Sequence, residues 1–300
     1  MTPATAERPA VGAPPVDGAR LAAAYAHCAR VARGHYENFT IGSWLLPRRL
    51  RDDLAAVYAF ARGGDDLADE GPEAGRLAAL AAWEQKLRAC AADPSAADDP
   101  VFVALGHTIA AHALPVDPLR DLLRAFRRDA AGETRAFATF PDLLEYCRGS
   151  ANPVGRTVLA LFGHRDGERQ ARSDQICTAL QLTNFWQDVR GDLERGRVYI
   201  PQADLDRFPG SRDALAARRM TPGFRQLLAF EVTRTRELFR AGLALANLTS
   251  GRLRREVRLF ARGGMAILDR IEAADYDVFE RRPTLRRVDL ARLVLRGMVG

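Results

Sequence analysis

Two groups of acidic and amide side chains occur at helical spacing in this chain. The first lies in the segment Arg62-Gly-Gly-Asp65-Asp66-Leu-Ala-Asp69-Glu70. On a helix, Asp65, Asp66 and Asp69 project from one face, with the first and last about 6 Å apart along the axis. Like charges at this spacing destabilise a helix unless a cation lies between them. A local rule broken in this way indicates a functional role.

The second group lies in Gln181-Leu-Thr-Asn184-Phe-Trp-Gln187-Asp188-Val-Arg190-Gly-Asp192. Asn184, Asp188 and Asp192 follow one another at intervals of four residues, so on a helix they form one polar stripe. The residues around the stripe are strongly apolar and include Phe185 and Trp186. A polar stripe on so apolar a helix is unlike an ordinary solvated helix face.

These side chains suit a magnesium site. Mg²⁺ prefers six oxygen ligands and keeps several waters, so one or two carboxylates per ion suffice and substrate phosphates can supply the rest. Two facing aspartate-rich helices could therefore hold a diphosphate and stabilise it as a leaving group, with Arg62 as a further bidentate phosphate contact. For one acidic motif alone, a solvated helix surface is the better interpretation. The two motifs together favour the metal site.

The elements that must position these groups are predicted to be helices. The chain has 300 residues, of which 47% are hydrophobic, enough for one large domain. Ala and Leu are abundant and β-branched residues are sparse, which favours an all-α fold. No βα alternation and no G-x-G triplet is present, which argues against a nucleotide-binding α/β fold. Helices are expected at about 19–33, from Pro47 onward, and at 73–92, 100–113, 117–131, 141–162, 168–195, 221–248, 251–274 and 287–298.

Two local features refine this pattern. Pro153 falls inside the predicted helix 141–162, so a kink is expected there, beside Gly155. Val198-Tyr199-Ile200 is the only short β-like run, and Pro201 ends it. Residues 1–17 are rich in Pro, Ala and Gly and are predicted to be a disordered tail, which leaves 18–300 as the domain.

Composition and charge indicate which partners and which cellular compartment to expect. The formal net charge is +6, but the basic residues are spread along the chain, so a nucleic-acid partner is not expected. The N-terminus shows no signal-peptide pattern, and no uncharged apolar stretch approaches about 18 residues. We therefore expect a cytoplasmic protein, for which a peripheral membrane contact stays open.

The four cysteines are predicted to be reduced and mostly buried. They form no C-x-x-C pair and no zinc-site spacing. They are Cys28, Cys90, Cys147 and Cys177.

Four segments of the chain resemble the head-to-head trans-prenyl synthases, the squalene/phytoene synthase family. The segments are 58–69, 146–155, 181–201 and, more weakly, 276–281, and they lie within roughly residues 35–283. Four motifs in the family's order make a specific signal. The resemblance implies a single isoprenoid synthase domain with a central prenyl cavity, two aspartate-rich helices at the mouth of that cavity, and Mg²⁺ as cofactor.

The resemblance also implies roles for individual residues. The implied metal ligands are Asp65, Asp66, Asp69, Asn184, Asp188 and Asp192. The residues implied to act on the reacting part of the substrate are Tyr146 and Gln181. The residues implied to bind the substrate diphosphate are Arg62, Asn38, Arg197 and Tyr276.

Two departures from the family pattern bear on the substrate. Members that join two prenyl diphosphates usually carry Ser-x-Ser-Phe before the first motif, where this chain has the stretch around Asn38. They also carry Arg before the first Asp of the second motif, where this chain has Gln187. Both changes remove expected phosphate contacts. Together with Ser150-Ala-Asn-Pro153-Val-Gly155, they resemble one bacterial branch, the hydroxysqualene synthases of hopanoid biosynthesis (the HpnC type).

This branch implies one reaction and two functional partners. Presqualene diphosphate is ionised, its cation rearranges, and water traps it as hydroxysqualene. A sister enzyme supplies presqualene diphosphate, and a flavin-dependent oxidoreductase reduces the alcohol. Two alternatives stay open. One is a squalene or phytoene synthase that condenses two farnesyl or geranylgeranyl diphosphates. The other is a non-catalytic prenyl-lipid-binding or assembly subunit, against which the two intact acidic motifs argue.

Overall fold

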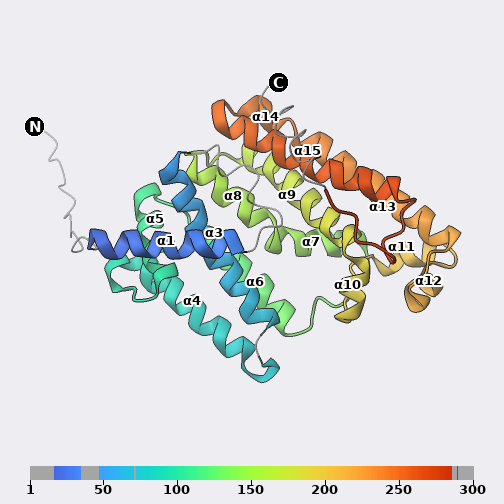
Figure 1. Ribbon diagram of the computed structural model, residues 1–300, viewed down its shortest axis with the longest axis horizontal. Coiled ribbons are helices and arrows are strands. Elements are labelled where there is room, and N and C mark those ends of the chain that lie inside the picture. The colour runs from blue at the N-terminus through green and yellow to red at the C-terminus, as the bar shows by residue number, and fades with distance from the viewer. Residues whose placement is uncertain (1–16, 35–46, 71, 286–288, 290–300) are drawn as a thin grey trace, which may run out of the picture.

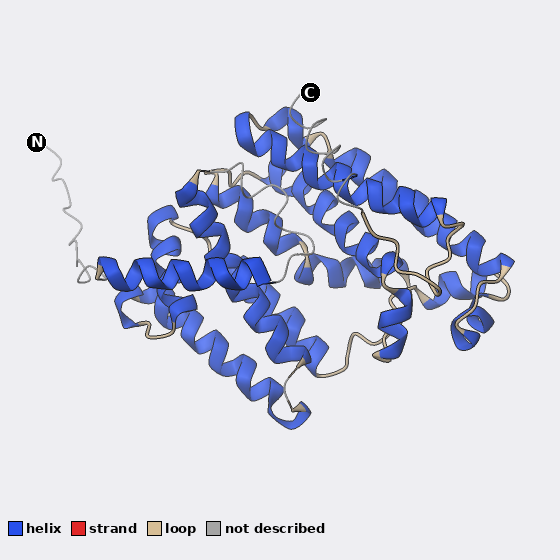
Figure 2. Ribbon diagram, in the orientation of Figure 1, coloured by secondary structure: helices blue, strands red, loops and turns tan. Residues whose placement is uncertain are grey.

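The computed structural model describes residues 17–34, 47–70, 72–285 and 289, and these are helical almost throughout (Figure 1, Figure 2). The only β-type pairing in these ranges is an isolated bridge between Ala136 and Val198, the latter in the predicted β-like run. The predicted all-α fold is therefore confirmed. Residues 1–16 of the predicted tail 1–17, the stretch 35–46 with Asn38 and almost all of the expected helix 287–298 lie outside the described residues.

The N-terminal half of the fold packs around one hydrophobic core that includes Phe60, Phe102 and Leu123. Its helices lie together at the blue-to-cyan end of Figure 1. They are α1 (Gly18–Gly34), α3 (Arg48–Asp69), α4 (Arg76–Ala92), α5 (Pro100–His112) and α6 (Asp117–Ala130), with the short 3₁₀ turns η1 (Glu73–Gly75) and η2 (Pro94–Ala96).

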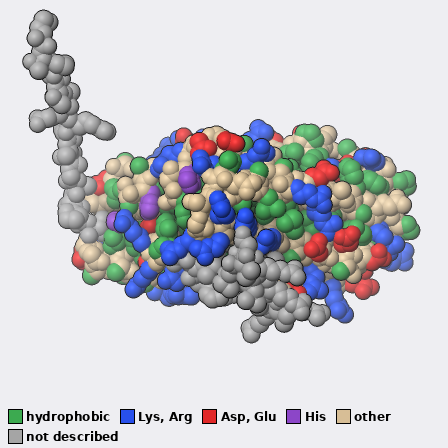
Figure 3. Space-filling view, turned by 90° about the horizontal axis from the view of Figure 1, so that it is seen from above, with side chains coloured by type: hydrophobic (Ala, Val, Ile, Leu, Met, Phe, Trp, Pro, Cys, Tyr) green, Lys and Arg blue, Asp and Glu red, His purple; other side chains and the backbone are tan. Residues whose placement is uncertain are grey.

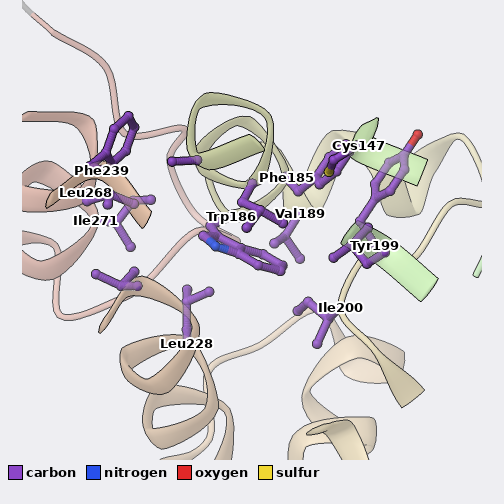
Figure 4. Packing of buried hydrophobic residues seen from close by; sticks show 14 of the residues in the cluster. Cys147, Phe185, Trp186, Val189, Tyr199, Ile200, Leu228, Phe239, Leu268 and Ile271 are labelled. Carbon is purple, nitrogen blue, oxygen red and sulfur yellow. The ribbon is translucent and has the colours of Figure 1, made fainter. Parts of the chain in front are cut away.

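The second half packs around another core, in which Trp186 is fully buried (Figure 4). The Trp186 indole Nε1 donates a hydrogen bond to Thr235 Oγ1 at 2.8 Å, so the one polar atom of this ring is satisfied. The helices of this half are α7 (Phe140–Ser150), α8 (Asn152–Leu161), α9 (Gly167–Gln187), α10 (Val189–Glu194), α11 (Gln202–Arg207), α12 (Ser211–Ala217), α13 (Pro222–Gly242), α14 (Leu245–Leu248) and α15 (Gly251–Ala273).

The kink expected at Pro153 is a full break, so the predicted helix 141–162 is divided into two helices. α7 ends at Ser150, and Pro153 lies in the first turn of α8, where its missing N–H removes no helical hydrogen bond. Gly155 follows at a close approach of two helices. A Cβ at this position would lie 2.3 Å from Ser173 Oγ and 2.5 Å from Cys177 Sγ, so only glycine lets α8 pack this closely on α9.

Other boundaries differ from the prediction. The expected helix 168–195 is divided at Asp188, and 221–248 is divided after Gly242. The short helices α11 and α12 were not predicted, because each spans less than two full turns and shows no clear apolar period.

The four cysteines are free, and three of them are buried, as the sequence predicts. Burial raises the pKa of each thiol to about 12. Among the described helices, none combines the length and the apolar character that a membrane crossing requires. Figure 3 shows Lys and Arg side chains in several places on one face, among hydrophobic and acidic side chains.

One buried carboxyl group gives the fold a pH dependence. The Glu256 side chain on α15 is only 6% exposed, and it has no hydrogen bond or ion pair among the described residues. Burial raises its pKa from 4.5 to about 7. The folded protein therefore holds this proton more tightly than the unfolded chain, so the free energy of unfolding falls as pH rises from about 4.5 to about 7.

We expect Glu256→Gln to leave the melting temperature at pH 5 nearly unchanged and to raise it at pH 8. The gain in free energy of unfolding at pH 8 is about 1–3 kcal/mol, because the amide replaces a carboxylate that must ionise without a partner. Thermal melts at the two pH values measure this difference. Glu237→Gln on the exposed side of α13 is the control. A lower melting temperature for Glu256→Gln at pH 8 would contradict an unpaired carboxylate.

Candidate active site

The first acidic group occupies the last two turns of α3, and the second spans the junction of α9 and α10. Arg197, in the loop after α10, connects them. Its Nη2 donates to Asp69 Oδ1 at 2.6 Å and its Nη1 to Asp69 Oδ2 at 3.3 Å. The Arg197 backbone N–H donates to the Asp192 carbonyl at 2.8 Å. One arginine thus holds the two predicted groups together.

Asn184, Asp188 and Asp192 keep their helical spacing although the helix breaks at Asp188. Asp188 has φ −105° and ψ 14°, outside the helical range, and ends α9. The Asp188 N–H still donates to the Asn184 carbonyl, and the Asp192 N–H to the Asp188 carbonyl, each at 2.9 Å. The prediction of one continuous helix was wrong here, but the four-residue spacing survives because these two hydrogen bonds span the break.

Arg62, a predicted phosphate contact, pairs with carboxylates of its own helix. Its Nη1 donates to Asp65 at 3.3 Å, and its Nη2 lies against Asp66 and 3.3 Å from Glu70. Asp66 Oδ1 is buried and, despite this ion pair, has no partner in hydrogen-bond geometry. A buried carboxylate oxygen of this kind is available to a further ligand.

Burial and nearby negative charge raise two carboxyl pKa values in the acidic groups. The pKa of Asp65 rises to about 6 through burial and repulsion from Asp69. That of Asp192 rises to about 7 through burial and repulsion from Asp188. A cation bound between such groups would relieve both effects.

The donor set fits Mg²⁺. It consists of carboxylate and amide oxygens, and Asp66 Oδ1 is held by the Arg62 ion pair alone. Within the described ranges, no three His, Cys, Asp or Glu side chains converge into a complete metal cage. This arrangement suits an ion that keeps waters and takes its remaining ligands from a diphosphate.

Asp129 on α6 belongs to the same site and was missed by the sequence analysis. Its Oδ2 accepts a hydrogen bond from the Tyr146 hydroxyl at 3.1 Å, and its Oδ1 accepts one from Thr134. Burial raises the pKa of Asp129, and the charges of Arg197 and Asp69 also act on it. No local motif marks Asp129, so only its tertiary neighbours could identify it.

Three aromatic rings pack around the ring of Tyr146. The rings of Tyr199 and Phe185 stack with centroids 3.8 Å apart and 7° between their planes, and Phe137 lies 5.3 Å from Tyr146. Figure 4 shows Tyr199 and Phe185 near each other at one edge of the second core. Faces of such rings attract positive charge. A pocket of about 10 Å³ adjoins Phe185, Tyr199 and Asp192 and has room for about one water molecule. The larger prenyl cavity stays a prediction.

The remaining predicted residues are placed as follows. Gln181 and Asn184 are half-buried on α9, and neither side chain has a hydrogen-bond partner among the described residues. Tyr276 lies beyond the end of α15, and its charged neighbours are Glu272, Arg236 and Asp275, none of which belongs to either acidic group. Its diphosphate-binding role stays a prediction, as does that of Asn38, outside the described residues.

Comparison with known proteins identifies the family of this chain. The squalene/phytoene synthase family model matches residues 18–289. This chain belongs to the squalene/phytoene synthase family. The phytoene synthase of Thermus thermophilus is 36% identical, covering 90% of this chain and 91% of its own. The 15-cis-phytoene synthase of Synechococcus elongatus is 32% identical, covering 90% and 92%.

Solved structures show the same fold. The crystal structure of squalene synthase HpnC from Alicyclobacillus acidocaldarius is 45% identical and matches with a TM-score of 0.80, covering 86% of this chain and 97% of that one. A dehydrosqualene synthase crystallised with a ligand matches with a TM-score of 0.85 at 23% identity, which shows a shared fold. The isoprenoid synthase architecture inferred from the sequence is thereby confirmed.

The structure shows what Gln187 does in place of the Arg that is usual at this position in members that join two prenyl diphosphates. Gln187, at the position where those members carry Arg, is only 4% exposed, and its Nε2 donates to the Pro283 carbonyl. Arg190 Nη1 donates to the Phe279 carbonyl at 3.2 Å. The second motif thus anchors the C-terminal segment 279–283 through Gln187 and Arg190, and Gln187 is used for this contact.

Proposed function

We propose that this protein is a hydroxysqualene synthase, which converts presqualene diphosphate and water into hydroxysqualene and diphosphate. The buried Gln187 carries the proposal, because its amide is bonded to Pro283 instead of facing a second diphosphate. The 45% identity to a protein named squalene synthase HpnC supports the same branch of the family.

In this proposal, the acidic groups and the arginines handle the diphosphate. Mg²⁺ bound at the acidic groups would neutralise the diphosphate charge and favour its departure. Asp65, Asp66, Asp69, Asn184, Asp188 and Asp192 are the residues that would hold it. Arg62 and Arg197 would turn from carboxylate to phosphate oxygens, which a guanidinium binds with the same two-pronged geometry.

The aromatic side of the site would handle the cation. The carbon–oxygen bond to diphosphate breaks with its electron pair on the leaving oxygen, and the cyclopropylcarbinyl cation rearranges. Phe185, Tyr199 and Tyr146 stack on one another, and a ring face of this stack that adjoins the substrate would favour positive charge. Water then forms the new carbon–oxygen bond and loses one proton, so one water is consumed for each diphosphate released.

A second candidate is a condensing synthase that joins two prenyl diphosphates. It is favoured by the named relatives, because two proteins called phytoene synthase align over about 90% of this chain. Condensation needs phosphate contacts for two substrates, and the bonding of Gln187 to Pro283 removes one position that could provide them. A non-catalytic prenyl-lipid-binding role would leave Asp65 and Asp192 crowded against like charges without a use for the cation that relieves them.

Product analysis separates these candidates. Purified protein with Mg²⁺ receives presqualene diphosphate or farnesyl diphosphate separately, with and without NADPH, and extracts are identified by mass spectrometry. We expect presqualene diphosphate alone to be consumed, giving hydroxysqualene without NADPH. Coupling of farnesyl diphosphate, or of geranylgeranyl diphosphate in a parallel reaction, would establish the condensing synthase instead. No turnover of any of the three would favour the binding role.

A further inference from the structure

Arg282 neutralises one of the predicted metal ligands from a distant part of the chain. Its Nη2 donates to Asp188 Oδ2 at 3.0 Å, and its Nε donates to Asp188 Oδ1. Both oxygens of the carboxylate are therefore occupied by one guanidinium. The two residues are 94 positions apart, and both side chains are partly exposed, at 39% for Arg282 and 30% for Asp188.

The same arrangement occurs on the other acidic group. Arg197 binds both oxygens of Asp69 from 128 positions away. Each group thus has an aspartate whose oxygens are held by an arginine from another element. A metal ion and a guanidinium compete for the negative charge and the lone pairs of the same carboxylate, so the ion pair with Arg282 weakens metal binding by Asp188.

We propose that Arg282 holds Asp188 in the substrate-free protein and transfers to the diphosphate when the magnesium diphosphate binds. This inference rests on the metal site of the proposed function and adds a diphosphate-binding residue to it. A guanidinium pairs with carboxylate and phosphate in the same bidentate manner, so the transfer replaces one set of charge-assisted hydrogen bonds with another.

The backbone around Arg282 can remain in place during this exchange. Gln187 and Arg190 bond the carbonyls of Pro283 and Phe279 on either side of it. Val278 and Phe279 are buried in the second core, at 1% and 3% exposure. A side chain with several rotatable bonds can therefore turn from Asp188 toward a ligand beside it while its backbone stays anchored.

If this exchange occurs, Arg282→Gln should raise the affinity for Mg²⁺ alone and lower the affinity for magnesium pyrophosphate. In Arg282→Gln, the competitor for Asp188 is gone, so Mg²⁺ alone should bind about two- to fivefold more tightly, the scale of a partly exposed ion pair. Inorganic pyrophosphate in saturating Mg²⁺ should bind about tenfold more weakly, because charge-assisted hydrogen bonds to it are lost. Isothermal titration calorimetry on the full chain measures both affinities.

Two further variants control this experiment. Arg281→Gln removes the same charge from the adjacent, exposed position and should change neither affinity by more than about twofold. Arg282→Lys keeps the charge but not the bidentate geometry, so its affinities should lie between those of the wild type and Arg282→Gln. Circular dichroism melts establish that each variant is folded.

The outcomes separate this inference from the proposed function. Unchanged or weaker Mg²⁺ binding in folded Arg282→Gln, with the wild type binding Mg²⁺, would overturn the exchange and leave the proposed metal site intact. Unchanged pyrophosphate binding would likewise overturn the transfer. Equal effects in Arg281→Gln would show a general charge effect and overturn it as well. A wild type that binds neither Mg²⁺ nor pyrophosphate would overturn the metal site and the exchange together.

Discussion

Asp65→Asn should lower turnover of the prenyl diphosphate about 10³-fold while the protein stays folded. The substitution removes one negative charge from the crowded end of α3, where the pKa of Asp65 is already raised to about 6. A cation held there would lose a charged ligand, and the leaving diphosphate would lose its stabilisation. Steady-state kinetics with Mg²⁺, together with a thermal melt, measure both parts of this prediction.

Asp188→Asn is expected to have an effect of the same size, because it disables the other acidic group. The matched control is Asp213→Asn, an exposed aspartate on α12 that belongs to neither acidic group. It should retain wild-type turnover. Near wild-type activity in either Asp65→Asn or Asp188→Asn would show that the metal assignment is wrong.

Tyr146→Phe should lower turnover about 10²-fold with little change in KM. The lost hydroxyl donates to Asp129, which also lies in the electrostatic surroundings of Asp69 and Arg197. Its removal leaves the Asp129 carboxylate without one donor inside the candidate site, where the proposed function places the reacting part of the substrate. Kinetics at saturating and limiting substrate separate the effects on kcat and KM.

Tyr25→Phe is a matched control for this variant. The Tyr25 hydroxyl also bonds to an aspartate, Asp53 at 3.1 Å, and in addition to His107 and Thr108, so it joins α1 to α3 and α5. Both variants should lose about 1 kcal/mol of stability, whereas only Tyr146→Phe should lose activity. Combining Tyr146→Phe with Asp129→Asn should cost less than the sum of the two, because both break one contact. Additive losses would show that the pair does not act together.

The sequence alone determined features that depend on neighbours a few residues apart. Spacings of three and four residues placed Asp65, Asp66 and Asp69 on one helix face, and the structure bears this out in α3. Pro153 marked the division between α7 and α8, because proline lacks the N–H that a helix interior requires. Ala- and Leu-rich composition fixed the all-α class. These are properties of local backbone geometry, which sequence periodicity expresses directly.

Only the tertiary structure decided how the site is assembled. Arg197 reaches Asp69, and Arg282 reaches Asp188, over 128 and 94 positions in the chain. Asp129 stands in no motif and joins the site because α6 packs against α7. Gln187 turned out to hold Pro283. Such contacts depend on which helix faces meet after folding, and the order of residues along one helix carries no record of the side chains that will lie opposite it.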